Sequence, residues 1–345
     1  MLAIVPENTP EGYNDEMTLQ KRVLGRTGLS VSPIGLGTTE IGYVYGIGPR
    51  ELPSEEAVIE FLQAIVALGV TFIDTGHFYG AAEERIGKSG IAQTPGVIVS
   101  TKCGHVLDRG EEISDAELAR AMRAEVEESL RKLKLDVIPL VQVHGGSAER
   151  IKDGSIIAGM QAIKDAGLAQ YVGISTRGEE APLAAIESGF FDTLQLAHNV
   201  LDQRMVARVF AEAKKKNIGI INRSVLLKGA LTPASQYLAP QLAELKKNSD
   251  MAGEIAKELG TDLPALAIRF ALSNEAVSTV LVGSNKIKNI EKAVAAAEAG
   301  PLPPEILTKL RALAITDPLQ VDPKNWPAEM VADSKDGKPV HDTKH

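Results

Sequence analysis

The chain has 345 residues, of which 44% are hydrophobic, and this length suits one large α/β barrel as well as two ordinary domains. Its 37 basic and 45 acidic residues give a net charge of −8, and no basic block or basic-aromatic stripe points to nucleic-acid binding. The single cysteine, Cys103, excludes an intrachain disulfide and fits a reducing, cytoplasmic compartment.

Strand-like and helix-like segments alternate along the chain. The predicted strands are 31–37, 71–76, 97–103, 137–144, 171–176, 193–198, 218–224 and 278–282. The predicted helices are 54–68, 83–90, 114–133, 156–166, 180–188, 202–216, 242–259, 263–272 and 287–297. Ser54 is placed to cap one helix, and Ser114 with Glu117 forms a capping box at another.

Eight short apolar strands that alternate with helices predict a closed parallel sheet, the (β/α)8 or TIM barrel. The alternative is an open doubly wound sheet, whose dinucleotide-binding form expects G-x-G-x-x-G after the first strand. Here the corresponding segment, residues 35–40, reads GLGTTE and lacks the third glycine. Residues 21–33 predict a small β-hairpin that caps the N-terminal face of the barrel.

The predicted division of the chain is an N-terminal arm at 1–20, a catalytic barrel at 21–315 and a C-terminal tail at 316–345, frayed from 333 onwards. Long loops at 104–113 and 226–241 are expected over the C-terminal mouth of the barrel. The lone Trp326 either folds the tail over that mouth or packs on the outside of the barrel. We expect neither a membrane span nor a secretory signal.

Polar side chains follow several predicted strands, at the end where a (β/α)8 barrel carries its active site. Asp74 and Tyr79 follow the second strand, Lys102 ends the third, and His144 ends the fourth. A lysine cation beside a tyrosine favours the phenolate, a carboxylate keeps the lysine charged, and a histidine orients a substrate oxygen or relays a proton. Such a set can pass a proton to a carbonyl oxygen as a hydride reaches the carbon.

Each of these residues has a plainer interpretation on its own. Asp74 can cap a turn, Lys102 can extend to the surface, and His144 can be a core histidine; only their conjunction favours catalysis. A metal-dependent hydrolase that uses His77, His105 and His144 is a second possibility. The first predicted strand lacks the His-x-His and the eighth lacks the acid that such barrels carry, so we expect no metal.

Seven motifs in order carry a family resemblance over about residues 20–300. They are RVLGRTGLSVSPIGLGT at 22–38, DTGHFYGAAEERIG at 74–87, STK at 100–102, VQVHG at 141–145, VGIST at 172–176, LQLAHNVLD at 194–202 and LVGS at 281–284. The chain thus resembles the aldo-keto reductase superfamily. The resemblance implies a barrel that binds a nicotinamide dinucleotide without a Rossmann domain. It also implies a catalytic tetrad of Asp74, Tyr79, Lys102 and His144, with Tyr79 as general acid/base.

The resemblance also implies the residues that contact the cofactor. They are Gly37, Thr38, Thr39, Asp74, Ser175, Thr176, Gln195, Arg223, Ser224, Leu226, Lys228, Gly283, Ser284 and Asn285. Thr176 replaces the usual asparagine, and Arg223 stands where many members stack a tyrosine on the nicotinamide. The implied cofactor is NADP, with NAD as the alternative, because Asn289 and Ala293 depart from the pattern of NADP-preferring relatives.

The predicted function is therefore an oxidoreductase that moves a hydride between NAD(P)(H) and an aldehyde, a ketone or a sugar hemiacetal. The alternative is a cofactor-sensing regulatory subunit with little turnover, as some members of the superfamily are ion-channel partners. The expected partner is a small carbonyl or sugar molecule. The sequence leaves open which one, the physiological direction and the oligomeric state.

Overall fold

The computed structural model describes residues 19–327. Most of the predicted arm, residues 1–18, and the end of the predicted tail, residues 328–345, lie outside this range. None of the helices between residues 19 and 327 is both long and apolar enough to cross a membrane.

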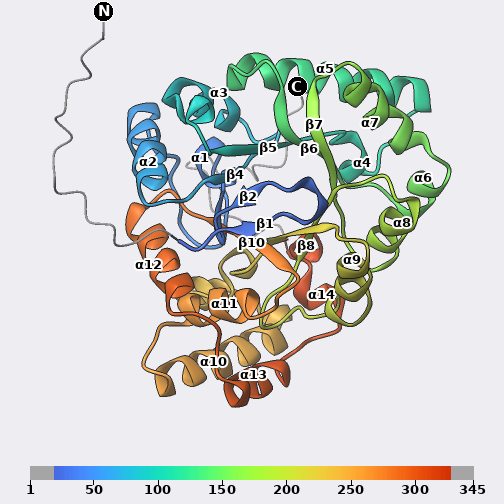
Figure 1. The fold of residues 1–345 in the computed structure, drawn as a ribbon. Helices are drawn as coiled ribbons and strands as arrows, with labels where there is room; N and C mark the ends of the chain where they lie inside the picture. Colours follow the sequence, from blue (N-terminus) through green and yellow to red (C-terminus); the bar gives the residue numbers. More distant parts are fainter. Residues whose placement is uncertain (1–18, 328–345) are drawn as a thin grey trace, which may run out of the picture.

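Eight parallel strands close into a barrel in the order β10-β3-β4-β5-β6-β7-β8-β9, which confirms the predicted fold (Figure 1). The strands are β3 (Ile34–Gly37), β4 (Phe72–Asp74), β5 (Ile98–Cys103), β6 (Ile138–His144), β7 (Ala169–Ser175), β8 (Thr193–Ala197), β9 (Gly219–Arg223) and β10 (Val277–Gly283). Each strand pairs in parallel with the next, so all eight carboxyl ends meet at one rim of the barrel.

Helices surround the barrel. They are α1 (Thr39–Gly42), α2 (Glu55–Ala67), α3 (Ala82–Ser89), α4 (Val106–Arg109), α5 (Asp115–Leu133), α6 (Ala148–Lys152), α7 (Ser155–Asp165), α8 (Glu180–Ser188), α9 (Ala211–Lys215), α10 (Ala243–Glu258), α11 (Leu263–Leu272), α12 (Ile287–Glu298), α13 (Pro304–Arg311) and α14 (Pro318–Val321). The predicted cap at Ser54 and the capping box of Ser114 with Glu117 are both present. These caps satisfy backbone N–H groups that a helix start leaves free.

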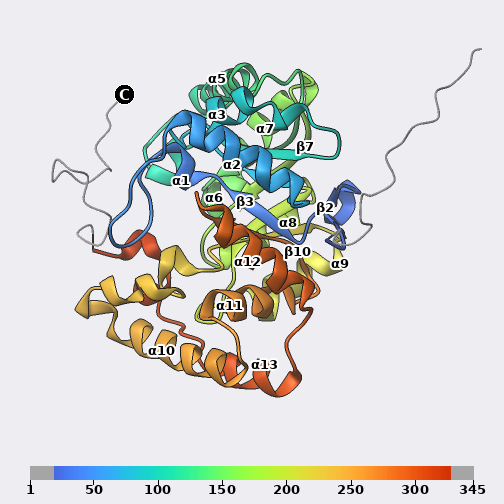
Figure 2. The same cartoon turned by 90° about the vertical axis from the view of Figure 1, so that its left-hand side faces the viewer.

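The predicted hairpin is formed by β1 (Arg22–Val23) and β2 (Ser30–Val31). It closes the end of the barrel where the strands begin: Arg22 donates to the carbonyl of Val277, and Ser278 donates to that of Val23. A Cβ on Gly25 would lie 2.2 Å from the nitrogen of Gly219, so the hairpin reaches β9 only because residue 25 is glycine. In Figure 2, β2 lies at the opposite end of the barrel from α1.

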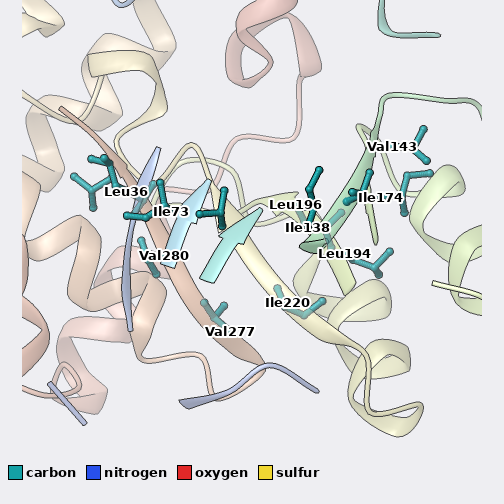
Figure 3. Packing of buried hydrophobic residues seen from close by; sticks show 14 of the residues in the cluster. Leu36, Ile73, Ile138, Val143, Ile174, Leu194, Leu196, Ile220, Val277 and Val280 are labelled. Carbon is teal, nitrogen blue, oxygen red and sulfur yellow. The ribbon is translucent and has the colours of Figure 1, made fainter. Parts of the chain in front are cut away.

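Alternation along the strands separates the two faces of the barrel wall. Leu36, Ile73 and Val280, on neighbouring strands, belong to the large buried cluster under the helices (Figure 3). The residues that alternate with these point into the barrel. There, Phe72 and Ile98 form part of a separate apolar cluster with residues of the hairpin. The next inward position along β4 is therefore Asp74, one layer above this apolar floor.

Two elements begin several residues later than the sequence predicts. Val31 belongs to the hairpin, paired with Arg22, and the first barrel strand begins only at Ile34, after Pro33. The predicted helix 202–216 is interrupted, because a π-helical segment, Val206–Phe210, precedes α9. The Asn199 side chain accepts hydrogen bonds from the backbone N–H groups of Leu201 and Asp202, and this local turn competes with a helix start.

The loops at the carboxyl ends of the strands contain short helical turns. The loop 104–113 includes α4, and the loop 226–241 includes three 3-10 segments, Leu227–Gly229, Pro233–Tyr237 and Pro240–Leu242. The last described segment lies over the same mouth, because Lys324 donates to the carbonyl of Asp108 at 2.7 Å. Trp326 is buried and donates to the carbonyl of Gln320, so both Trp326 and α14 pack at this end.

Candidate active site

The inward ends of β4 and β5 place a charged pair inside the barrel. The Nζ of Lys102 donates to Asp74 Oδ2 at 2.6 Å and to the carbonyl of Thr75 at 2.7 Å. The side chains of Lys102 and Asp74 are only 1% and 4% exposed. A buried ion pair needs further hydrogen bonds to offset its desolvation, and this pair has them.

Two glutamines complete the environment of Asp74. Asp74 Oδ1 accepts from Gln142 Nε2 at 3.1 Å and from Gln195 Nε2 at 2.8 Å. The Asp74 carboxyl group therefore accepts three hydrogen bonds, and these favour its ionised form. Gln142 also donates to Ser100 Oγ at 2.7 Å and so ties three strands together. Gln142 is a functional candidate that the motifs do not indicate, although an amide within the apolar strand 138–143 is itself a signal of a buried hydrogen bond.

Burial opposes both charges of the pair. It keeps the pKa of Asp74 above its ordinary value, although the Lys102 cation and the hydrogen bonds from Lys102, Gln195 and Gln142 act in the opposite direction. Burial by itself would lower the pKa of Lys102, but Asp74 and Tyr79 more than offset this effect, so the pKa of Lys102 lies above its ordinary value. The ammonium group is consequently charged at any physiological pH and fixed by two oxygen acceptors.

Tyr79 lies in the turn that follows β4. Its backbone N–H donates to the carbonyl of Gly76, and a Cβ on Gly42 would lie 1.8 Å from its carbonyl oxygen, so this turn packs directly on α1. Lys102 Nζ lies 4.8 Å from the centre of the Tyr79 ring. The Tyr79 and His144 rings meet edge to face with centroids 6.0 Å apart. The structure therefore brings Asp74, Tyr79, Lys102 and His144 together at the rim.

His144 contacts a second histidine from the loop 104–113. His144 Nδ1 and His105 Nδ1 are 3.2 Å apart. Burial, reinforced by the Lys102 cation, lowers the pKa of His144 to about 3, and burial lowers the pKa of His105 to about 4. Both imidazoles are thus neutral near pH 7, and each has one N–H and one lone pair to offer.

His77 does not join this group. Its two ring nitrogens lie 3.9 Å from Glu83 and 3.8 Å from Glu128, on opposite sides of the ring. The hydrolase hypothesis placed His77, His105 and His144 around one ion, and the structure brings only the last two into contact. Within residues 19–327 His77 is not part of the group of potential metal ligands that contains His105 and His144.

A cavity of about 1200 Å³ runs from this cluster along the rim of the barrel. Nearly all the residues predicted to contact a cofactor line it, namely Gly37, Thr39, Asp74, Ser175, Thr176, Gln195, Arg223, Ser224, Leu226, Lys228, Gly283, Ser284 and Asn285. Thr38 is not among the lining residues: it is buried, and its hydroxyl donates to the carbonyl of Asp74 at 3.0 Å. Its position supports the strand end and does not reach the cavity.

Arg223 lies between β7 and the loop that follows β9. Its guanidinium donates to the carbonyl of Thr176 at 3.0 Å and to Ser224 Oγ at 3.2 Å, so its plane is held at the cavity wall. Ser224 has a φ of 60°, a left-handed conformation that is uncommon for a residue with a side chain. Asn199 Nδ2 donates to the carbonyl of Ser224 at 3.0 Å and stabilises that turn.

The far end of the cavity lies at the start of α12. Ser284 Oγ accepts from the backbone N–H of Lys286 at 3.1 Å and from Asn289 Nδ2 at 3.0 Å. Lys286, Asn289 and Lys292 line the cavity here, whereas Lys288 is not among its lining residues. A helix N-terminus with lysines beside it suits a phosphate group.

The cavity fits an elongated polar ligand. Its volume of about 1200 Å³ exceeds the roughly 300–1,000 Å³ that is usual for small-molecule sites, so it has room for a large ligand. At the end near β7 the Thr176 hydroxyl is buried and has no hydrogen-bond partner within the described chain, and Ser175 donates to Gln195 Oε1 at 3.2 Å. These groups can orient a planar amide, and the lysines at α12 can contact a phosphate. The residues present therefore fit a nicotinamide dinucleotide.

Fold and site together define a (β/α)8-barrel enzyme in which a tyrosine at the mouth lies beside a buried lysine–aspartate ion pair. The comparisons with known proteins specify the class further: the model of the Aldo/keto reductase family matches residues 33–315. The chain therefore belongs to the aldo/keto reductase family, whose members are oxidoreductases that use nicotinamide cofactors.

Individual relatives align over most of the chain. L-galactose dehydrogenase of Arabidopsis thaliana is 31% identical, over 81% of this chain and 88% of the relative. A probable voltage-gated potassium channel subunit beta of Oryza sativa is 28% identical, over 88% and 99%. Among solved structures, the holo form of an aldo-keto reductase from Bacillus halodurans superposes with a TM-score of 0.71 at 25% identity, over 87% of this chain and 97% of that chain.

Proposed function

We propose that this protein transfers a hydride between NAD(P)(H) and a small carbonyl compound or sugar hemiacetal, with Tyr79 as general acid/base. The observation that carries the proposal is the buried Lys102 ammonium, held by Asp74 at 2.6 Å and placed 4.8 Å from the Tyr79 ring. A phenol at the rim of a cavity, next to a fixed cation, suits proton exchange with a substrate oxygen. The nicotinamide, when bound, supplies or accepts the hydride.

Each residue of the cluster has a separate role in the proposed proton transfer. In reduction, Tyr79 donates its proton to the carbonyl oxygen, and the Lys102 cation stabilises the phenolate that remains. Asp74 keeps Lys102 charged and in place, through a carboxylate that Gln142 and Gln195 also orient. Neutral His144, beside Tyr79, donates a hydrogen bond to the same substrate oxygen. In oxidation each of these steps runs in reverse.

Residues at the near end of the cavity support a polyhydroxylated substrate. Tyr43, Tyr45, Phe78 and Trp326 line the mouth together with the Asp108 carboxylate. Aromatic faces pack against the C–H face of a sugar ring, and a carboxylate accepts hydrogen bonds from its hydroxyls. A relative that bears the name L-galactose dehydrogenase makes an aldose the first substrate class to test.

Cofactor titration followed by a substrate panel tests the proposal. Quenching of the single tryptophan, Trp326, and energy transfer from it to the reduced cofactor report binding of NADH and NADPH separately. The tighter cofactor is then used with aldoses and simple aldehydes in both directions. We expect saturable binding of at least one cofactor and turnover of aldoses above that of simple aldehydes. Absence of binding by both cofactors would exclude the proposed function.

The similarity to a potassium channel subunit beta keeps a regulatory role as the second candidate. A cofactor sensor would bind NAD(P)(H) tightly but turn over every aldehyde and aldose slowly. Single-turnover hydride transfer separates the two functions, because a sensor with intact catalytic groups completes one transfer and then retains the product cofactor. Rapid multiple turnover favours the enzyme, and one transfer per chain favours the sensor.

A further inference from the structure

Two side chains of the loop 104–113 converge on His144, and the proposed hydride transfer does not require this contact. His105 immediately precedes α4, Asp108 lies within it, and His144 ends β6. One potential ligand atom from each of the three lies within 4.8 Å of the others. Among residues 19–327, no other group of three or more histidine, cysteine or acidic side chains lies close enough together to hold one metal ion.

The separation of the two histidine nitrogens matches zinc coordination. Zn–N bonds of about 2.0–2.1 Å at a tetrahedral angle place two nitrogens about 3.3 Å apart. The Nδ1 atoms of His105 and His144 are 3.2 Å apart. In the metal-free protein one Nδ1–H must donate to the other Nδ1, and a shift of that proton to Nε2 frees both lone pairs for an ion.

Packing holds the three ligands in place. The His105 ring stacks on Phe78 with centroids 3.6 Å apart and an interplanar angle of 13°. A Cβ on Gly145 would lie 2.9 Å from the Asp108 Cα, so residue 145 must be glycine for α4 to approach the end of β6. Gly104, at the start of the loop, donates to Glu125 Oε2 at 2.5 Å.

Asp108 also has the partner that a metal-bound carboxylate needs. Arg177 donates to Asp108 Oδ1, and its guanidinium contacts Asp322 at 3.6 Å. One oxygen of Asp108 is thereby oriented, and Oδ2 remains for a metal. Carboxylates that bind metal ions are typically held by a hydrogen bond from a residue outside the ligand set, and Arg177 provides that bond here. The set of two imidazoles and one carboxylate, with a fourth position open to the cavity, suits zinc.

We propose that His105, Asp108 and His144 bind Zn²⁺ or a similar transition-metal ion, and that the bound ion inhibits the enzyme. All three side chains line the cavity, so the ion occupies its near end and fixes the His144 ring. It also places a second positive charge close to Lys102 and ties the loop 104–113 to the barrel. The binding stands by itself, whereas the inhibition rests on the proposed reductase function.

The direct test is Zn²⁺ titration of the full chain, after treatment with a chelator, in competition with a zinc-sensitive dye. We expect one strong site, and we expect Asp108→Asn and His105→Gln each to weaken it by at least about tenfold. His77→Gln is the matched control, because this loop histidine stands outside the cluster. A variant with His341 and His345 both changed to Gln removes any contribution from the C-terminal tail.

Two further measurements make the outcome decisive. X-ray absorption of the zinc-loaded protein should show two imidazole ligands, and thermal unfolding should show that zinc stabilises the wild type but not Asp108→Asn. If the enzyme is active, Zn²⁺ should lower the rate of the wild type relative to its own metal-free rate, and it should leave the rate of Asp108→Asn at the metal-free value of that variant, whatever that value is. No binding by the wild type at tens of micromolar zinc, or equal affinity in Asp108→Asn and the wild type, would overturn the site. Zinc binding without inhibition would overturn the inhibitory role alone.

Discussion

Lys102 Nζ lies 2.6 Å from Asp74 Oδ2, and both side chains are almost completely buried. This contact places a permanent cation beneath the Tyr79 ring, in a position where water cannot screen it. The proposed proton transfer by Tyr79 depends on this cation and on the ion pair that keeps it charged.

Tyr79→Phe removes the hydroxyl and keeps the ring that packs against His144 and Lys102. We expect kcat to fall by about three orders of magnitude, since that is the scale of a lost general acid. Cofactor affinity should change little. The matched control is Tyr43→Phe, which removes the hydroxyl of a neighbouring tyrosine. The centroid of the Tyr43 ring lies 6.5 Å from that of Tyr79. Burial raises the pKa of Tyr43 well above its ordinary value, so this phenol is a poor acid, and its loss should spare most of the turnover. Equal losses in both variants would show that Tyr79 has no special role.

Lys102→Met should damage stability and activity together. The change leaves the Asp74 carboxylate buried without its cation, which typically costs about 3–5 kcal/mol. Adding Asp74→Asn removes the stranded charge, so the double variant should regain part of the free energy of unfolding, measured by urea denaturation. The double variant should remain as inactive as Lys102→Met, because the Tyr79 phenol lacks its neighbouring cation in both. A double variant less stable than Lys102→Met would contradict this account.

The barrel could be predicted from the sequence, and so could the position of most candidate site residues at its mouth, because their signals are local. Apolar strands followed by polar residues, as at 72–79 and 98–102, specify both the strand and the end that carries function. The boundary error at Val31 came from Pro33, whose missing N–H ends one strand pairing and lets another begin. The interrupted helix after Asp202 reflects a side-chain turn at Asn199 that competes with helical hydrogen bonds.

Contacts between distant segments could not be predicted in the same way. Gln142 reaches Asp74 across two strands, and Arg177 reaches Asp108 from the loop after β7. The pairing of His105 with His144 depends on how closely α4 approaches Gly145, which only the folded chain determines. Conversely, Thr38 follows a strand end as a cofactor residue would, yet it turns to the carbonyl of Asp74.

Arg223→Gln should weaken cofactor binding more than it changes the chemical step. Hydrogen bonds to Thr176 and Ser224 fix the guanidinium at the cavity wall, where a planar ring can stack on it. We expect the Kd for NAD(P)H to rise about fivefold, consistent with the loss of one stacking contact of about 1 kcal/mol, and kcat to change far less. Fluorescence titration measures the Kd. Arg109→Gln is the control, because Arg109 lines the same cavity but is half exposed and pairs with Glu111. An unchanged Kd in Arg223→Gln would exclude the stacking role.

His198 should make the protein less stable in mild acid. It is buried between the Phe210 and Phe270 rings, and burial lowers its pKa from 6.5 to about 4. Between pH 6.5 and pH 4, His198 is therefore protonated in the unfolded chain but mostly neutral in the folded protein. The contribution of His198 to stability is complete above pH 6.5 and is lost as the pH falls towards 4, by about 3 kcal/mol in all.

The variant His198→Gln cannot titrate, so the comparison concerns slopes and is independent of any constant loss of packing. We expect the free energy of unfolding of the wild type to fall more steeply than that of His198→Gln between pH 6.5 and pH 4, with parallel behaviour between pH 7 and pH 8. Urea denaturation at several pH values supplies both curves. Other groups that titrate in this range, such as Glu83 with a pKa raised by burial, act equally in both proteins and cancel in the difference. Parallel curves throughout would mean that His198 is protonated in the folded state as readily as in the unfolded chain.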